Sequence, residues 1–101
     1  MPPPNKETYL RASETGLLSS GVRSADGVIK PGPGKVYWLT ISPVGGAQLN
    51  DSIDDSGDDL WQIQIPSDGY AHIIFDPPLE FETGIWLDVP TGSPKVIVGY
   101  I

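Results

Sequence analysis

The chain has 101 residues, no cysteine and a formal net charge of −7. This length suits one small domain, and the lack of cysteine excludes disulfides, thiolate catalysis and cysteine metal sites. Residues 1–50 carry five basic and three acidic side chains, and residues 51–101 carry one basic and ten acidic ones. This distribution excludes a stripe of basic residues that binds nucleic acid. It favours docking on an oppositely charged protein surface.

The N-terminal part predicts an arm followed by one domain. Residues 1–5 contain three consecutive prolines and predict an extended arm, either a tail or a segment lying on a neighbouring subunit. Residues 6–101 are predicted to form a single domain, and residues 6–12 (KETYLRA) its first strand. The Ser- and Gly-rich residues 13–24 predict a loop or a poorly formed edge strand. No stretch is a signal peptide or a membrane helix, so we expect a soluble protein without a membrane partner.

The strongest strand signal is KVYWLTIS, residues 35–42, after a short predicted strand at residues 27–30. Alternation divides its side chains into two faces, Tyr37, Leu39 and Ile41 on one and Val36, Trp38 and Thr40 on the other. Gly45 and Gly46 follow, and they predict a hairpin that returns through residues 47–51.

The second half repeats this pattern of short strands and turns. Further strands are predicted at residues 60–65, 70–75, 79–82, 85–89 and 95–101. Pro77 and Pro78 are predicted to end the strand before them, because proline cannot donate to a ladder. The last strand is apolar on both faces, so it should be central in a sheet or covered by a partner. Eight or nine strands with essentially no helix predict an all-β, antiparallel, jelly-roll-like β-sandwich.

Two features could carry chemistry. The aspartates within residues 51–59 could supply oxygen ligands to calcium, but their spacing is not that of an EF-hand. The alternative is that this segment is a solvated hairpin loop. His72 is the only histidine and alternates with Tyr70 and Ile74, as a residue on a sheet face does. No nucleophile, metalloprotease or phosphate-loop motif is present. We predict no enzyme activity, cofactor or metal, and leave calcium binding by the loop open.

The aromatic residues point to an interface. Trp61 shares a face with Ile63 and is predicted to lie in the core. Trp38 lies on the face of its strand opposite Leu39 and Ile41, and Trp86 lies on the face opposite Leu87 and Val89. If these faces point outward, the two tryptophans are exposed, and together with Tyr100 they are candidate protein-interface residues. Two alternatives are that both sheet faces are covered within the monomer, or that a tryptophan stacks on a sugar.

The strand and turn pattern of residues 27–101 resembles small β-sandwich virion proteins of tailed bacteriophages. The resemblance is carried by GVIKPGPGKVY, LTIS, FDPPLEF, TGIWL and VIVGY. It implies the capsid decoration (cement) class: a homotrimer that binds the major capsid protein on the virion surface after synthesis in the host cytoplasm. Lys6 and Arg11 would meet acidic capsid groups. The alternative is a carbohydrate- or receptor-binding module of a tail fibre or spike.

Overall fold

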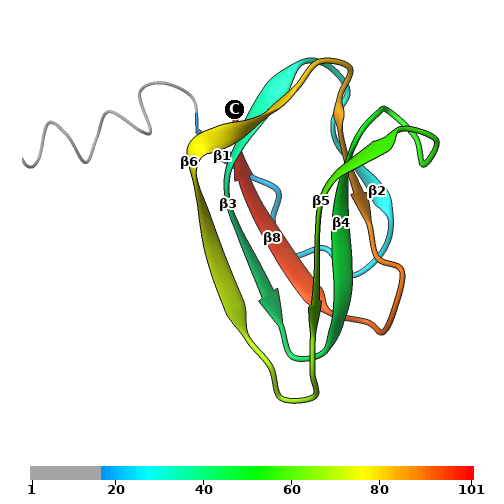
Figure 1. Ribbon diagram of the computed structural model, residues 1–101, viewed down its shortest axis with the longest axis vertical. Coiled ribbons are helices and arrows are strands. Elements are labelled where there is room, and N and C mark those ends of the chain that lie inside the picture. Colours follow the sequence, from blue (N-terminus) through cyan, green and yellow to red (C-terminus); the bar gives the residue numbers. More distant parts are fainter. Residues whose placement is uncertain (1–16) are drawn as a thin grey trace, which may run out of the picture.

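The computed structural model describes residues 17–101, which form two four-stranded antiparallel sheets packed against each other (Figure 1). The strands are β1 (Leu18–Ser19), β2 (Gly27–Lys30), β3 (Gly34–Ser42), β4 (Gly45–Asp51), β5 (Asp58–Ile65), β6 (Ala71–Phe81), β7 (Ile85–Asp88) and β8 (Lys95–Tyr100). The predictions of an arm at residues 1–5 and a strand at residues 6–12 lie outside the described residues.

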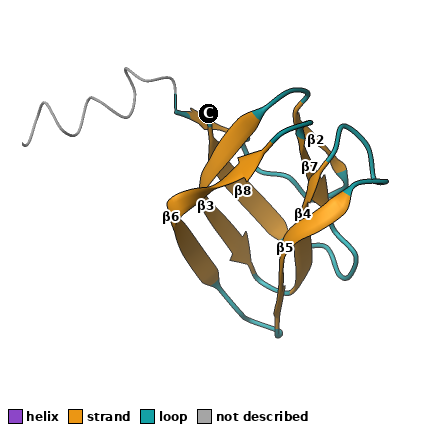
Figure 2. Cartoon of the chain, turned by 45° about the horizontal axis from the view of Figure 1, so that its top comes forward, coloured by secondary structure: helices purple, strands orange, loops and turns teal. Residues whose placement is uncertain are grey.

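The predicted all-β sandwich is confirmed. We name the sheet with strand order β1-β8-β3-β6 sheet A and the sheet with order β2-β7-β4-β5 sheet B (Figure 2). The last strand, β8, lies between β1 and β3, so its predicted central position is also correct. Jelly-roll connectivity stays a prediction. Among residues 17–101 there is no helix with the length and apolarity needed to span a membrane.

The core fills the space between the inner faces of the two sheets. Its buried side chains are Ile29, Val36, Leu39, Ile41, Ala47, Leu49, Ile65, Phe81, Ile85, Leu87, Val96 and Val98. At the edges formed by β5 and β6, Trp61 and Phe75 meet edge to face with 5.2 Å between ring centroids. Trp61 is half-buried against the core, as predicted, and this pair helps to close one side of the sandwich.

A bulge in β3 changes which residues face the core. Val36, Leu39 and Ile41 are all fully buried, although Val36 and Leu39 are three positions apart. The pairing register of β3 shifts between Val36 and Trp38 against both neighbouring strands, which places Tyr37 in the bulge. The prediction that Tyr37, and not Val36, shares a face with Leu39 and Ile41 is therefore wrong, because one extra residue reverses the alternation.

Opposite Tyr37, β6 has an irregularity of its own that contains its two prolines. β6 pairs with β3 through Ile74 opposite Trp38 and through Leu79 opposite Val36, and the residues between them have no ladder partner on β3. Pro77 and Pro78 lie in this unpaired stretch, so no ladder bond requires their N–H. The predicted strand end at Phe75 is wrong, because proline is tolerated at a bulge on an edge strand.

The predicted hairpin after β3 is also wrong. Gly45 has the positive φ of 122° that the glycine pair suggested, but β4 belongs to sheet B, so the turn crosses from one sheet to the other. A Cβ at Gly45 would lie 2.5 Å from the Thr91 carbonyl oxygen, so this crossing also needs glycine for close packing.

Asp51 ties the end of β4 to the turn between β6 and β7. Its carboxylate accepts backbone hydrogen bonds from Thr83 (2.7 Å), Glu82 (3.1 Å) and Gly84 (3.3 Å). Burial raises the pKa of Asp51, but the three bonds together outweigh it, so the pKa lies below the usual 3.8. Asp51 is thus a structural residue, and the loop is limited to residues 52–57.

Asp51→Asn should lower the free energy of unfolding at pH 7 by about 1 kcal/mol, because the amide cannot reproduce charge-assisted bonds from three N–H groups. A carboxylate with a lowered pKa stabilises the fold above the unfolded pKa and loses that contribution as pH falls through the folded pKa. The difference from wild type should therefore shrink below about pH 4. Thermal unfolding of both proteins from pH 7 to pH 3 measures this. Asp55→Asn, in the exposed loop, is the control, and an equal effect of both changes would contradict the assignment.

Candidate functional site

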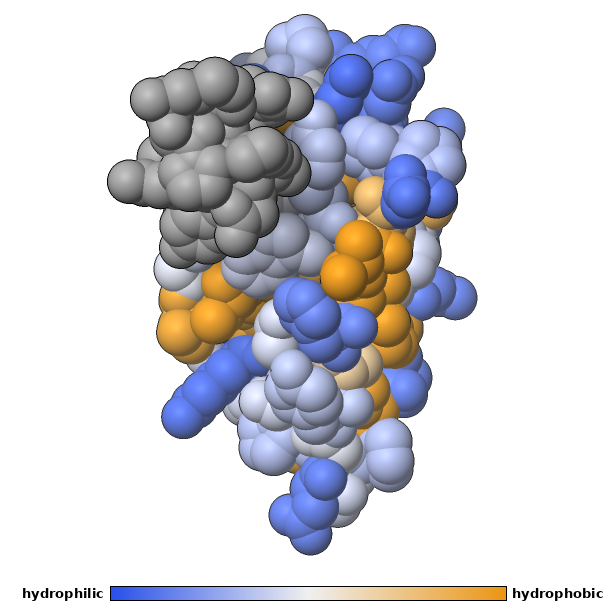
Figure 3. All heavy atoms as spheres, turned by 90° about the vertical axis from the view of Figure 1, so that its left-hand side faces the viewer, coloured by the Kyte–Doolittle hydropathy of each residue, from blue (hydrophilic) through white to orange (hydrophobic). Residues whose placement is uncertain are grey.

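The outer face of sheet A carries aromatic and apolar side chains. We name it the Trp38 face and define it by Trp38, Thr40, His72, Ile74 and Ile97, which point away from the core on β3, β6 and β8. Figure 3 views the side of the molecule on which β6 lies and shows hydrophobic surface next to hydrophilic residues. Ile74 is 71% exposed, the highest value among the large hydrophobic side chains of residues 17–101.

Trp38 is held flat on the sheet by a neighbouring glycine. Gly99 lies opposite it on β8, and a Cβ at Gly99 would be 2.1 Å from indole atoms Cε2 and Nε1. On the other side the Trp38 and His72 rings are 5.8 Å apart, and the Nδ1 of His72 is hydrogen-bonded to the Thr40 hydroxyl at 2.7 Å. The missing side chain of Gly99 thus provides a seat for the indole, and the tryptophan has little orientation left to lose on binding.

The outer face of sheet B is polar and acidic. We name it the Trp86 face and define it by Trp86, Asn50, Asp88, Gln48 and Gln62, which follow one another across β7, β4 and β5. Gln48 donates a 3.1 Å hydrogen bond to Gln62. These two glutamines also line a shallow hollow of about 350 Å³ together with Ile63, Gln64 and Pro90.

Two polar atoms on the Trp86 face are buried without a partner among the described residues. They are Nε1 of Trp86 and Oδ1 of Asn50, which belong to directly paired residues of β7 and β4. Asn50 is only 2% exposed. An unsatisfied buried donor or acceptor lowers the free energy of unfolding, so the paired residues Trp86 and Asn50 are a site of local destabilisation.

A carboxyl pair lies at the edge of the same face. Burial raises the pKa of Asp88, and the negative charge of Asp26 beside it raises it further. Asp26 also accepts a 2.7 Å hydrogen bond from the backbone N–H of Val89, which holds it in place next to Asp88. Repulsion between these carboxylates makes the ionised Asp88 a source of instability at neutral pH.

The structure separates the residues that the sequence grouped as one interface. Trp38 and Trp86 lie on opposite outer faces of the sandwich, so one flat partner surface cannot contact both. Tyr100 is half-buried and packs against the core at the end of β8. Lys6 and Arg11 lie outside the described residues. His72 is on a sheet face, as predicted.

Several residues of the two faces were not identified as candidate functional residues from the sequence. Ile74 and Gly99 looked like ordinary strand residues, and their role depends on which residue lies opposite each of them. A weak signal existed for Gly99, since glycine inside an apolar strand often marks the close approach of another group.

The acidic segment does not gather into a metal site. Within residues 17–101 no group of three or more His, Asp or Glu side chains is placed to hold a metal ion. Asp54 instead accepts hydrogen bonds from the hydroxyl and N–H of Ser56 and from the Ser52 hydroxyl, which lower its pKa. Asp54 therefore orders the loop locally.

Comparisons with protein-family models, curated proteins and solved structures gave no match. The resemblance to phage virion proteins therefore stays a prediction. No functional residue is transferred to this chain from a known protein, and the two faces have to be interpreted from their own chemistry.

Gly99→Ala should destabilise the protein by about 1–3 kcal/mol, because the added methyl group overlaps the indole of Trp38. In a Trp38→Ala background the same change should cost far less, since the seat is then empty. Denaturant unfolding of the four proteins gives the coupling between the two positions. Gly32→Ala is the matched control, since a Cβ there would meet nothing within 4 Å. Equal costs in both backgrounds would show that the indole does not use this seat.

Asp88→Asn should raise the melting temperature at pH 7 by roughly 2–4 °C, the shift expected from about 0.5 kcal/mol in a domain of this size. A carboxyl with a raised folded pKa contributes full stability below its unfolded pKa of 3.8 and loses it as pH rises through the folded value. The neutral amide keeps that contribution at pH 7, so the advantage of the variant should disappear below about pH 4. Melting curves across this range measure it, with Asp58→Asn as an exposed acidic control. A melting temperature of Asp88→Asn below that of wild type at pH 7 would contradict this prediction.

Proposed function

We propose that the protein is a non-enzymatic decoration protein that binds the outer capsid lattice of a tailed phage and stabilises it. The observation that carries this proposal is the Trp38 face, where the exposed side chain of Ile74 lies beside a tryptophan fixed on Gly99. Exposed apolar groups around a rigid tryptophan are typical of protein-binding hot spots. The partner in this proposal is the major capsid protein.

The proposal places the two faces in different roles. The Trp38 face carries His72 and few charges, so it loses little hydration energy when it docks. The Trp86 face carries the Asp26–Asp88 pair, and burying this pair against a partner would cost considerably more. We therefore place the Trp38 face on the capsid and the Trp86 face toward solvent.

The proposed assembly is a homotrimer located on the virion surface, made in the host cytoplasm. A trimer is supported by the size of the chain, because one small sandwich offers a limited contact area and three linked copies bind a repeated lattice with a gain in avidity. The basic residues Lys6 and Arg11 belong to the proposed capsid contact, through attraction to acidic groups that salt would screen.

Ile74→Asp should leave the protein folded and weaken capsid binding at least about tenfold, because it places a charge in the centre of the proposed contact. Co-sedimentation with undecorated capsids measures the binding, and thermal unfolding checks the fold. Ile53→Asp is the matched control, since Ile53 is 55% exposed but lies in the loop after β4, away from the Trp38 face.

The outcomes separate the parts of this proposal. Equal binding by wild type and Ile74→Asp would reject the Trp38 face as the contact. No binding of wild type to any capsid of its phage would reject the decoration function. Light scattering of the free protein should give the mass of three chains, and a monomer would reject a trimer that forms without the capsid.

A second candidate function is binding of a carbohydrate, as in a tail fibre or spike module. The observation that favours it is the Trp86 face, where a hollow lined by Gln48, Gln62 and Gln64 offers amide groups on the same face of the sheet as Trp86. A glycan array in which binding is lost on Trp86→Ala and kept on Trp38→Ala would favour this function over decoration.

A further inference from the structure

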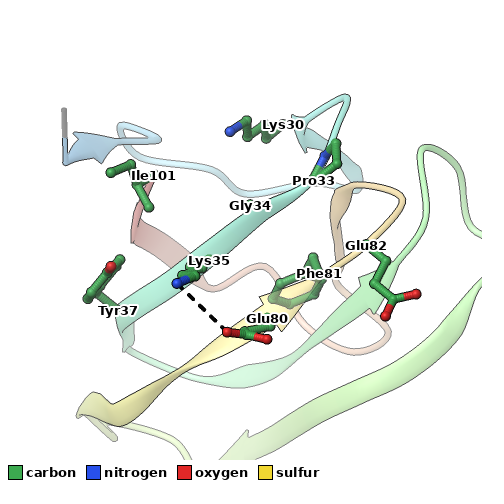
Figure 4. Close-up of a pocket in the computed structure, with 9 residues that line it drawn as sticks. All are labelled: Lys30, Pro33, Gly34, Lys35, Tyr37, Glu80, Phe81, Glu82 and Ile101. Carbon is green, nitrogen blue, oxygen red and sulfur yellow. Dashed lines mark ion pairs between the residues drawn. The ribbon is translucent and has the colours of Figure 1, made fainter. Parts of the chain in front are cut away.

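A hollow on the described surface lies at one end of sheet A, near the start of β3 and the end of β6. It has a volume of about 620 Å³ and is mostly apolar, with Tyr37, Phe81 and Ile101 among its walls. Figure 4 shows these side chains around it, coming from β3, β6 and the residue after β8. The size is within the range of pockets that bind small ligands or single side chains.

Charged side chains of both signs surround the hollow. Lys30 and Lys35 lie on its rim with Glu80 and Glu82, and the Lys35 Nζ is 3.7 Å from a Glu80 carboxylate oxygen (Figure 4). An occupant that suits this rim has an apolar or aromatic centre and one charge of each sign beside it. A purely apolar or a strongly charged occupant would leave rim charges without a partner.

The described chain begins at the edge of this hollow. Ile101 exchanges two backbone hydrogen bonds with Lys35, of 3.0 and 3.1 Å, and the residue before it, Tyr100, pairs with Leu18 of β1. Since β1 and β8 are antiparallel, the start of β1 lies at the end of β8. The described chain therefore begins next to Ile101, a wall of the hollow.

The sequence just upstream has the composition that the rim requires. In KETYLRA, residues 6–12, alternation places Glu7, Tyr9 and Arg11 on one face. This face has an aromatic centre with one acidic and one basic neighbour. The eight residue steps from Tyr9 to Leu17 span up to ~26 Å when extended, and a chain this long can turn back over a pocket that lies beside Leu17.

We propose that the hollow is the docking site of the chain's own N-terminal segment, with Tyr9 in the pocket. Arg11 then meets the acidic rim residues Glu80 and Glu82, and Glu7 meets Lys30 and Lys35. The segment adds apolar cover to Tyr37 and Ile101 within the same chain. This inference concerns the free protein, in which Arg11 has no capsid partner, so it does not depend on the proposed capsid function.

A disulfide-trapping experiment tests it, because the chain has no cysteine of its own. Tyr9→Cys is combined with Tyr37→Cys in the full chain and exposed to mild oxidant. We expect an intramolecular cross-link, in at least about tenfold greater yield than with the control pair Tyr9→Cys and Tyr70→Cys, because docking raises the effective concentration of one thiol near the other. Tyr70 is a suitable control, since it is 69% exposed and does not line the hollow.

Other results overturn the proposal. Cross-linked dimers without the intramolecular species would assign the pocket to the segment of a second copy. Equal yields for the two pairs would show that the segment is not docked there.

A second measurement keeps the question decidable if the Tyr37→Cys variant is unstable. In the full chain, Tyr9→Ala should raise the amide hydrogen-exchange rate of Lys35 and Ile101 at least about threefold, because it removes their cover. Leu10→Ala, on the opposite face of the predicted strand, should change it less. Unchanged exchange in Tyr9→Ala would also overturn the proposal. Because no capsid is present in either experiment, failure here would leave the decoration proposal intact, and failure of capsid binding would leave this one intact.

Discussion

The apolar layer between the two sheets determines which side chains of every strand are exposed on the outer faces. Each strand must turn alternate side chains inward to fill this layer, so the remaining side chains are forced outward whatever their chemistry. In β3 this demand is strong enough to require a bulge, because Val36, Leu39 and Ile41 are all needed inside. The outward position of Trp38 follows from where the bulge falls. The candidate contact surface is therefore a consequence of how the core is packed.

The architecture was largely predictable from the sequence, and the errors have local causes. Strands punctuated by Gly, Pro and Asp predicted the sandwich and the central position of β8 correctly. The alternation in β3 failed because a bulge reverses the phase and leaves no mark in a run of strand-forming residues. The prolines of β6 were misjudged because their effect depends on whether a neighbouring strand needs their N–H, which is a property of the sheet. Likewise, Gly45 signalled a turn but not the sheet to which the turn leads.

The candidate site was less predictable, because it consists of pairs of residues from distant strands. Tryptophans could be assigned to the outer faces, but nothing in the sequence indicated that Trp38 and Trp86 lie on opposite sides of the molecule. The seat of Trp38 requires Gly99, which is far away in the chain and opposite only in the folded sheet. Asp51 shows the same limit, since it looked like one more charge in an acidic loop until its three backbone partners were seen.

The edges of the sandwich have a consequence for how copies can meet. β6 is the long edge strand of sheet A, and its unpaired stretch with Pro77 and Pro78 offers a neighbouring chain an irregular, donor-poor margin. β5, one edge of sheet B, begins with Asp58 and Asp59, whose charges would be opposed by the same charges of a second copy. Copies that meet along β5 or β6 are therefore discouraged from joining their sheets into a continuous ribbon. At these two edges, even copies at very high local density stay discrete particles.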